Sequence, residues 1–374
     1  MSKGSVLQLI NSYSWSGAEL FASNLALSLD QIGYDAQVCS IAPIRNKKEE
    51  QLFNQLSSQG LGVTSLEKTP GKKSPQALYR LSRLLRNNDL DLIHTHCSSP
   101  DFYGRLASLF NPEVQSVVTF HGTQYKNVFP NKLLTFTTDT HIAVSEAVRS
   151  WAQKQFALTT EDIEVVYNGI DRSKFENITI EPQAKKSQLG VNTDNPVITS
   201  VGRLESCKGH RYLISALRVL KKRGVEIELL LVGDGDLAEE LHHRVEKRGL
   251  SDSVHFLGVR MDVNEILAIS DAFVMPSLWE GLGIAALEAM GVGVPVIASK
   301  VGGLVEIIDH GSTGFLVPPK DSVAIANFLE KLLKNPDMSE HMASQARSQV
   351  LKNFTIQESV KGYDKVYQSI LKEV

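Results

Sequence analysis

Short apolar runs alternate with longer amphipathic stretches along most of the chain, which predicts strands followed by helices. Most of the runs are almost entirely apolar, as is typical of strands in a parallel sheet that is covered on both faces. In the first half, strands are expected at 5–10, 36–41, 90–94, 115–120, 141–144 and 163–166. In the second half, strands are expected at 197–201, 226–232, 254–257, 272–275 and 294–298, and helices at 209–222, 236–248, 282–290, 322–334, 339–351 and 356–371.

The alternation is interrupted at 176–196, a polar stretch with two prolines that is typical of a linker. A chain of 374 residues also exceeds the size at which a single core usually stops growing. We therefore predict an α/β protein of two doubly wound domains that face each other across a cleft, with ligands at the carboxyl ends of the strands. The predicted parts are an N-terminal domain 1–175, a linker 176–195, a C-terminal domain 196–352 and a last helix within 353–374.

Composition narrows the class of protein. The formal net charge of −3 argues against a general reader of nucleic acid. Cys39, Cys97 and Cys207 are far apart, so no disulfide framework is implied, and this fits a reducing cytoplasm. No apolar run approaches the roughly 18 residues that a membrane span needs, and the first residues lack the apolar core of a signal peptide.

Two basic residues, Arg203 and Lys208, fall in the loop after the expected strand 197–201. Two cations in one loop can neutralise a diphosphate, and an arginine adds a planar fork of hydrogen-bond donors. From this loop alone, solvated surface charge is the simpler interpretation.

The segment 279–290, WEGLGIAALEAM, places two glutamates eight residues apart. Eight helical residues amount to a rotation of roughly 80° over about two turns, so Glu280 and Glu288 can face one ligand at different depths. Gly281 and Gly283 allow close backbone approach at a helix start, where free N–H groups and the helix dipole favour an anion. A buried Glu288 needs partners, and either the hydroxyls of a sugar or ribose or a nearby basic residue would serve.

Other polar residues at strand ends allow both a functional and a structural interpretation. Ser16-Gly17 opens a helix, so a backbone N–H there can approach a phosphate. A lone histidine such as His121 is more often structural, but its position after a strand improves the odds of a function. His94 and His96 invite a metal interpretation, but we expect strand alternation to separate their side chains, and no cysteine or acidic cluster accompanies them.

Residues 233–238, GDGDLA, match the dinucleotide fingerprint G-x-G-x-x-A. The fingerprint also expects an acid at the end of the next strand, and it normally lies on the first strand of its domain. Here the next strand is followed by Gly258-Val259-Arg260, and the match lies on the second strand. The sequence therefore disfavours NAD as a cofactor.

Taken together, these residues resemble the retaining glycosyltransferases of family 4, which have the GT-B fold. The matching segments run in the family's order over nearly the whole chain, and the ordered set is far more specific than any one of them. The resemblance rests on 16–19 (SGAE), 121–122 (HG), 168–171 (NGID), 201–204 (VGRL), 208–209 (KG), 231–235 (LVGDG), 276–277 (PS), the pair Glu280 and Glu288, and 302–303 (GG).

The resemblance implies roles for individual residues. Arg203 and Lys208 match the basic pair that holds the donor diphosphate in place of a metal ion. Glu280 matches the acid beside the transferred sugar, and Glu288 matches the acid that binds the nucleotide ribose. The remaining matches are Gly17 in the loop that approaches the phosphates, His121 near the primary hydroxyl of the donor sugar and the reaction centre, the amides of Gly283, Ile284 and Ala285 around the phosphate and sugar, and Val259 and Arg260 near the base.

The resemblance further implies a GT-B fold whose C-terminal helix crosses back to the first domain. The implied reaction is a retaining, metal-independent transfer of a hexose or N-acetylhexosamine from a UDP- or GDP-sugar to a glycan or lipid-linked acceptor. Many similar bacterial enzymes build cell-surface polysaccharide or lipopolysaccharide, so we expect a cytoplasmic enzyme that can dock on the inner face of the membrane. Two departures from the family pattern are Ser16 in place of a glycine and Leu282 in place of an aromatic residue.

The segment 70–88 is predicted to form a basic amphipathic helix with Ser74 as its N-cap and Pro75 at its first position. Such a helix can lie on an anionic membrane through residues 72–88. The alternative is an ordinary helix whose leucine stripe packs on the sheet and whose charges are solvated. The stripe consists of Leu78, Leu81 and Leu85.

Other functions fit the same fold. A nucleotide-sugar epimerase would alter its sugar without any acceptor. A non-catalytic nucleotide-sugar-binding subunit would be expected to have lost Glu280, Arg203 or Lys208, and all three are present. A phosphorylase would need a lysine site for pyridoxal phosphate, which the sequence does not reveal.

Overall fold

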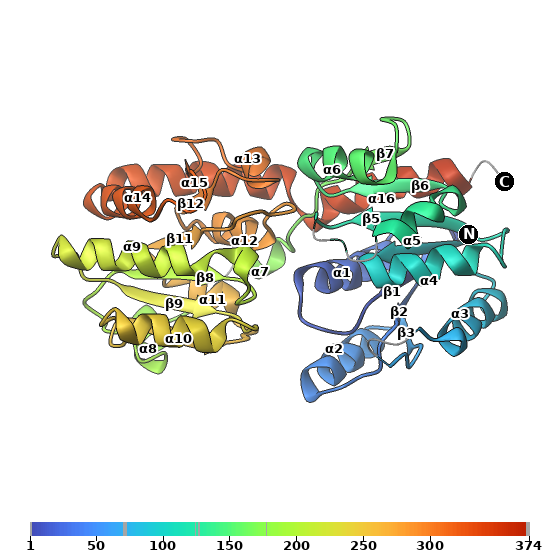
Figure 1. Ribbon diagram of the computed structural model, residues 1–374, viewed down its shortest axis with the longest axis horizontal. Helices are drawn as coiled ribbons and strands as arrows, with labels where there is room; N and C mark the ends of the chain where they lie inside the picture. Colours follow the sequence, from blue (N-terminus) through green and yellow to red (C-terminus); the bar gives the residue numbers. More distant parts are fainter. Residues whose placement is uncertain (1, 70–72, 124, 126–127, 177, 372–374) are drawn as a thin grey trace. The chain divides into compact units, whose positions relative to one another are not determined.

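The structure, a computed structural model, describes residues 2–69, 73–123, 125, 128–176 and 178–371. The chain divides into two compact units, each of which has its own sheet with helices on both faces (Figure 1). Unit 1 comprises residues 1–168 together with 356–374, and unit 2 comprises residues 169–355. The predicted class, α/β with two doubly wound sheets, is confirmed.

Unit 1 is built on a seven-stranded sheet in the order β3-β2-β1-β4-β5-β6-β7. Every neighbouring pair of strands is parallel. The order reverses between β1 and β4, so the loops that follow these strands flank the switch point where ligands bind in such sheets. The strands are β1 (Ser5–Ile10), β2 (Asp35–Ser40), β3 (Gly62–Ser65), β4 (Leu92–His96), β5 (Gln115–Phe120), β6 (Thr140–Ala143) and β7 (Ile163–Val165).

Alternate residues of the unit 1 strands serve two helical layers. Leu7 and Leu9 of β1 join a buried cluster with side chains of α3 and α4 on one face. Gln8, between them, contacts Tyr367 of α16 on the other face, where α1 packs against α16. The helices of unit 1 are α1 (Gly17–Gln31), α2 (Lys47–Ser58), α3 (Pro75–Asn87), α4 (Ser98–Ser108), α5 (Val128–Leu133), η1 (Thr135–Thr137), α6 (Glu146–Phe156) and α16 (Ile356–Leu371).

Unit 2 contains a six-stranded parallel sheet in the order β10-β9-β8-β11-β12-β13, with its switch point between β8 and β11. Its strands are β8 (Val197–Val201), β9 (Glu228–Val232), β10 (Val254–Gly258), β11 (Ala272–Met275), β12 (Val296–Ser299) and β13 (Phe315–Val317). Its helices are α7 (Ser173–Glu176), α8 (Pro182–Gln188), η2 (Ser206–Lys208), α9 (His210–Lys222), α10 (Ala238–Lys247), α11 (Val263–Ala268), α12 (Ile284–Val292), α13 (Leu304–Ile307), α14 (Ser322–Lys334) and α15 (Pro336–Asn353).

The stretch expected as a linker, 176–195, belongs instead to unit 2, and the chain passes between the units at residues 168–169 and 355–356. The physical reason is that two ion pairs of the buried Lys185 side chain hold α8 in place. Lys185 on α8 contacts the carboxylates of Asp262, at 2.6 Å, and Glu265, at 2.5 Å. Polar composition at this position therefore reflects long-range charge pairing and not chain freedom.

Candidate active site

The loops after β8 and β11 lie at the switch point of unit 2, and backbone contacts join them. Leu278 N–H donates to the carbonyl of Cys207 over 2.7 Å. Gly209 lies so close to the neighbouring loop that a Cβ there would be 2.1 Å from the carbonyl oxygen of Pro276. Because only glycine permits this approach, the sequence Lys208-Gly209 fixes the position of Lys208 beside the loop that precedes α12.

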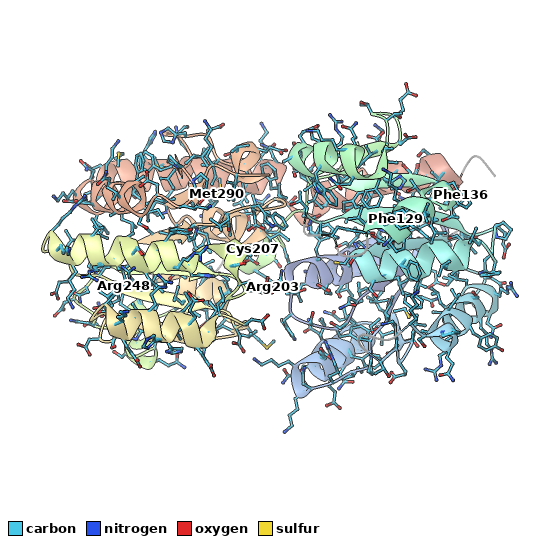
Figure 2. The ribbon with its side chains drawn as sticks, in the orientation of Figure 1. Phe129, Phe136, Arg203, Cys207, Arg248 and Met290 are labelled. Atoms are coloured by element: carbon cyan, nitrogen blue, oxygen red, sulfur yellow. The ribbon has the colours of Figure 1, made fainter. Side chains whose placement is uncertain are left out.

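Lys208 and Glu280 form an ion pair, with Lys208 Nζ 2.7 Å from Glu280 Oε2. Both side chains are largely buried, at 20% and 13% exposure, and Ser277 Oγ donates to the same carboxylate oxygen over 3.2 Å. Arg203, in contrast, has a side chain that is 60% exposed, and its Nη1 atom forms an ion pair with Glu205 over 2.7 Å. Figure 2 labels Arg203 and Cys207, which share the loop after β8.

The start of α12 lies directly after Glu280. Gly283 is its N-cap, with φ of 100°, and the N–H groups of Ile284 and Ala285 in the first turn have no acceptor within the helix. Gly302 packs against this loop so closely that a Cβ there would lie 1.9 Å from the carbonyl oxygen of Glu280. The arrangement offers an anion the amides and the positive end of a helix dipole, beside the Lys208 cation.

Glu288 lies one turn further along α12, and within the described part of the chain it has no hydrogen-bond or ion-pair partner. Burial raises the pKa of Glu288 to about 7, although the positive charge of Lys174 on α7 works in the opposite direction. The alternative of a basic partner in direct contact is therefore not what the structure shows. Buried carboxylates normally have hydrogen-bond partners, so an unpartnered one can accept hydrogen bonds from donor groups of a bound ligand.

The glycines of the dinucleotide-like match have a structural explanation. A Cβ at Gly233 would lie 2.0 Å from the carbonyl oxygen of Gly202, and Leu204 N–H donates to the carbonyl of Asp234 over 2.9 Å. The loop after β9 thus supports the loop that carries Arg203, and its glycines serve this close packing.

Val259 and Arg260, predicted near the base, follow β10. Gly233 N–H donates to Gly258 O over 2.8 Å, so this loop is joined to the one after β9. The Arg260 guanidinium is paired with Asp262 through two hydrogen bonds, while Val259 is 39% exposed. Their contact with a nucleotide base stays a prediction.

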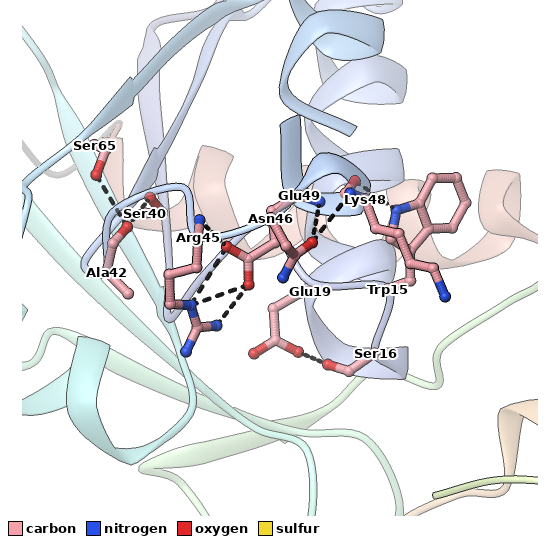
Figure 3. Close-up of polar contacts among 10 residues, drawn as sticks. All are labelled: Trp15, Ser16, Glu19, Ser40, Ala42, Arg45, Asn46, Lys48, Glu49 and Ser65. Carbon is pink, nitrogen blue, oxygen red and sulfur yellow. Dashed lines mark hydrogen bonds and ion pairs between the residues drawn. The ribbon is translucent and has the colours of Figure 1, made fainter. Parts of the chain in front are cut away.

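The loop before α1 in unit 1 contains Ser16 and Gly17 and is connected to α2 (Figure 3). Trp15 Nε1 donates to the carbonyl of Lys48 over 3.0 Å, and the Ser16 hydroxyl donates to Glu19. The Ser16 hydroxyl is therefore occupied by the Glu19 side chain in the first turn of α1 and makes no capping bond to the backbone of that helix. The backbone N–H of Gly17, at the first position of α1, has no acceptor within the helix and can donate to a phosphate.

His121, after β5, lies beside the two histidines of β4. The expectation that strand alternation separates His94 from His96 was wrong, because residues two positions apart on a strand share a face. Their ring centroids are 4.1 Å apart, and the His96 and His121 centroids are 5.1 Å apart. Burial lowers the pKa of His121 to about 3 and the pKa values of His94 and His96 well below the usual range.

The basic segment forms α3, which begins at Pro75 with Ser74 as N-cap, as predicted. Its leucine stripe packs inward: Leu81 and Leu85 are core residues, and Leu78 packs against them. The stripe is therefore explained by the sheet, whereas the arginines of α3 are exposed. Lys72, part of the predicted membrane segment, lies outside the described residues. Across the described residues, no helix is long and apolar enough to cross a bilayer.

Comparison with known families matches both halves of the chain. The family of glycosyl transferases group 1 matches residues 182–349, and glycosyltransferase family 4 matches residues 15–174. Among curated relatives, the N-acetyl-alpha-D-glucosaminyl L-malate synthase of Bacillus anthracis is 28% identical over 302 residues, which is 79% of this chain and 78% of that protein. The UDP-Gal:alpha-D-GlcNAc-diphosphoundecaprenol alpha-1,3-galactosyltransferase of Escherichia coli is 29% identical over 313 residues, again 79% and 78% of the two chains.

Solved structures give a consistent result. HepE of Anabaena, determined in complex with UDP and glucose, is 25% identical and superposes with a TM-score of 0.84 over 98% of this chain and 100% of that one. The GT-B arrangement of two Rossmann-like folds is thus shared with proteins of this group.

Proposed function

The chain belongs to glycosyltransferase family 4 and is a hexosyltransferase, and from this premise we propose a retaining, metal-independent transfer of a hexose or N-acetylhexosamine from a UDP-sugar. The observation that carries the proposal is the start of α12, where Lys208, Glu280 and the first-turn amides precede by one turn Glu288, which has no partner within the described part of the chain. The similar Anabaena structure contains UDP, which supports uridine over guanosine as the donor base. Both curated relatives have α-linked sugars in their names, as retention of an α-linked donor would produce.

Each group at α12 has a task in this reaction. Arg203 and Lys208 bind the diphosphate, and the N–H groups of Ile284 and Ala285 add donors at the positive end of the helix. Glu280 contacts the hydroxyls of the transferred sugar, while Glu288 accepts hydrogen bonds from the ribose hydroxyls. Fixed positive charge at the leaving group replaces the function that a metal ion has in other phosphate chemistry.

The bond from the anomeric carbon to the diphosphate oxygen breaks, and its electron pair leaves with the diphosphate. The acceptor hydroxyl oxygen then forms the new bond to the same carbon on the same face, through an oxocarbenium-like centre. The acceptor's proton passes to an oxygen of the departing phosphate. No side chain forms a covalent intermediate in this scheme.

Nucleotide binding tests the donor assignment. We expect UDP to raise the thermal midpoint more than GDP or ADP, and Arg203→Ala to remove the effect. Arg218→Ala, which removes an exposed arginine from the surface of α9, is the matched control and should keep it. Stabilisation by NAD alone would contradict the transferase proposal, and an altered sugar released without an acceptor would indicate an epimerase. The anomeric configuration of the product, read by proton NMR, tests retention.

We also propose a glycan or lipid-linked acceptor in surface polysaccharide or lipopolysaccharide synthesis, and an enzyme in the cytoplasm that docks on the inner face of the membrane. Phe129, Leu133 and Phe136 support docking, because they recur along α5 and η1 with 71%, 60% and 77% exposure (Figure 2 labels the two phenylalanines). α3 carries three arginines and no acid between Pro75 and Asn87, and α3, α5 and η1 all pack against α4. Exposed aromatic side chains and arginines grouped around one helix suit an anionic lipid surface.

Vesicle sedimentation tests the docking. We expect the protein to sediment with phosphatidylglycerol-containing vesicles and not with phosphatidylcholine vesicles, and the double variant Phe129→Ser, Phe136→Ser to stay in the supernatant. Val323→Ser is the control, since Val323 is 52% exposed but lies on α14 of unit 2. Equal sedimentation of wild type and double variant would refute the proposed surface.

A further inference from the structure

A chain of hydrogen bonds in unit 1, buried near α16 and partly buried at His121, connects helix α16 with His121. Gln8 Nε2 donates to the Tyr367 hydroxyl over 3.1 Å, and Gln8 Oε1 is 2.7 Å from His96 Nε2. His96 Nδ1 is in turn 2.8 Å from His121 Nε2. At the far end, Asn168 Nδ2 is 3.3 Å from His121 Nδ1. Both ring nitrogens of His96 and of His121 are therefore engaged.

The direction of donation follows from the Gln8 amide. Its carbonyl oxygen can only accept, so His96 Nε2 must carry a proton. The low pKa of His96 keeps the ring neutral, so His96 Nδ1 is bare and accepts from His121 Nε2–H. His121 is neutral for the same reason, which leaves His121 Nδ1 as a bare nitrogen that accepts from Asn168 Nδ2.

A second branch of hydrogen bonds runs from Tyr367 through His94 to Thr119, and its donors follow from the same orientation of the Gln8 amide. The Tyr367 hydroxyl accepts from Gln8 and donates to His94 Nδ1 over 2.6 Å. His94 Nε2 then donates to Thr119 Oγ1 over 2.7 Å. Thr119 Oγ1 is in turn 3.5 Å from the Tyr363 hydroxyl, so among the described residues this branch leads back to α16 and not to His121.

The opposite direction of donation along the hydrogen bonds from Gln8 to Asn168 would require the side-chain amides of both residues to be rotated by 180°, so that oxygen and nitrogen exchange places. As placed, the side-chain oxygen of Asn168, Oδ1, is buried and has no hydrogen-bond partner within the described residues. After reversal the buried amide group of Asn168, with its two N–H donors, would be the unpartnered one. An orphaned donor is costlier than an orphaned carbonyl oxygen, so the forward direction is favoured.

We propose that Gln8 and His96 are positioning residues that hold His121 in its Nε2–H tautomer, so that Nδ1 presents a lone pair. In the unliganded protein this lone pair accepts from Asn168 Nδ2. A substrate hydroxyl that displaces Asn168 must donate its proton to His121 Nδ1, which leaves the hydroxyl oxygen free to accept from other groups. This consequence for substrate rests on the proposed function, whereas the tautomer itself does not.

Nitrogen-15 NMR of the histidine rings in the unliganded protein tests the tautomer directly, with the His121 signals identified by their loss in His121→Phe. We expect the wild type to show one neutral species, protonated at Nε2, at neutral pH. A wild-type ring protonated at Nδ1 would overturn the proposal, and only the assignment of the signals relies on a variant.

Two variants of matched burial then separate positioning from general destabilisation. Gln8→Met removes the acceptor for His96 and should convert His121 into a mixture of both tautomers. Thr119→Val perturbs the other branch and should leave the single Nε2–H species. If Gln8→Met does not fold, Gln8→Asn, too short to bridge Tyr367 and His96, should produce the same mixture. A single Nε2–H species in either folded Gln8 variant would refute the role of Gln8.

Turnover gives an independent readout. We expect Gln8→Met to lower kcat about tenfold, as for the loss of one oriented hydrogen bond, with no change in UDP binding. Unchanged kcat with a mixed tautomer would overturn the catalytic consequence. If the tautomers follow the prediction but the wild type transfers no sugar, the proposed function fails and the tautomer inference stands.

Discussion

Replacement of Glu288 by glutamine should make the unliganded protein more stable and its nucleotide binding weaker. The carboxylate is desolvated on α12 and has no hydrogen-bond or ion-pair partner within the described residues, so in the absence of ligand its charge is a net cost to the fold despite the attraction of Lys174. Glutamine keeps the shape of the side chain and removes the charge. The two expected effects have opposite signs, which distinguishes this change from ordinary damage to a core.

The magnitude follows from the pKa. Its rise from 4.5 to about 7 corresponds to about 3 kcal/mol, at about 1.4 kcal/mol per pKa unit. Because the folded-state pKa lies above the unfolded one, the penalty is absent below about pH 4.5, grows as the pH rises through this interval, and is complete above about pH 7. The gain in unfolding free energy for Glu288→Gln should therefore be near zero in acid and about 3 kcal/mol at about pH 8.5.

Thermal unfolding of both proteins across this pH range measures the effect. Glu226→Gln, which neutralises an exposed acid in unit 2, is the control and should show no comparable pH dependence. UDP affinity, measured by calorimetry at neutral pH, should fall about 10- to 100-fold in Glu288→Gln, as for lost hydrogen bonds to a charged acceptor. Equal or lower stability of Glu288→Gln at high pH would refute the claim that the carboxylate is unpartnered and desolvated.

Three further changes test the rest of the unit 2 site. Arg203→Ala should weaken UDP binding about tenfold or more in calorimetry at an unchanged Tm, since its side chain is 60% exposed; a large fall in Tm would contradict this. Lys208→Met should lower both kcat and the unfolding free energy, the latter by about 1–3 kcal/mol in urea, because it leaves the largely buried carboxylate of Glu280 unpaired; unchanged urea stability would mean that the ion pair is weak. Gly302→Ala should cost more than about 2 kcal/mol and abolish transfer, because its Cβ would lie 1.9 Å from the Glu280 carbonyl; wild-type turnover would show that the loop has room to move.

The central strands were predictable because each is a short apolar run whose burial requires no distant information. β5, β8 and β11 begin and end at the predicted residues. The strands that escaped prediction, β3 and β13, lie at the edges of their sheets, where only one neighbour pairs with them. β3 is half-exposed along most of its length and has no apolar run to reveal it. Such strands are specified by the partner strand and not by their own pattern.

The unit 2 site was predictable as a set of loops, because parallel strands bring their carboxyl ends to one edge. The ion pair of Lys208 with Glu280 spans 72 residues, and position after a strand was enough to anticipate that the two loops meet. The hydrogen-bond chain to His121 was not found. The spacing of His94 and His96 carried the signal, since two positions apart means one face, but Gln8 and Tyr367 are 359 residues apart and no local pattern connects them.

The insertion of unit 2 between residues 168 and 356 of unit 1 has a consequence for biosynthesis. A ribosome completes every residue of unit 2 before it reaches α16, so unit 2 can fold while unit 1 still lacks a helix of its core. Tyr363 and Tyr367, which are fully buried in unit 1, arrive only after that interval, and until then Gln8 and His94 have no hydroxyl partner from α16. We therefore expect the nascent N-terminal half to need protection from aggregation until α16 has been made.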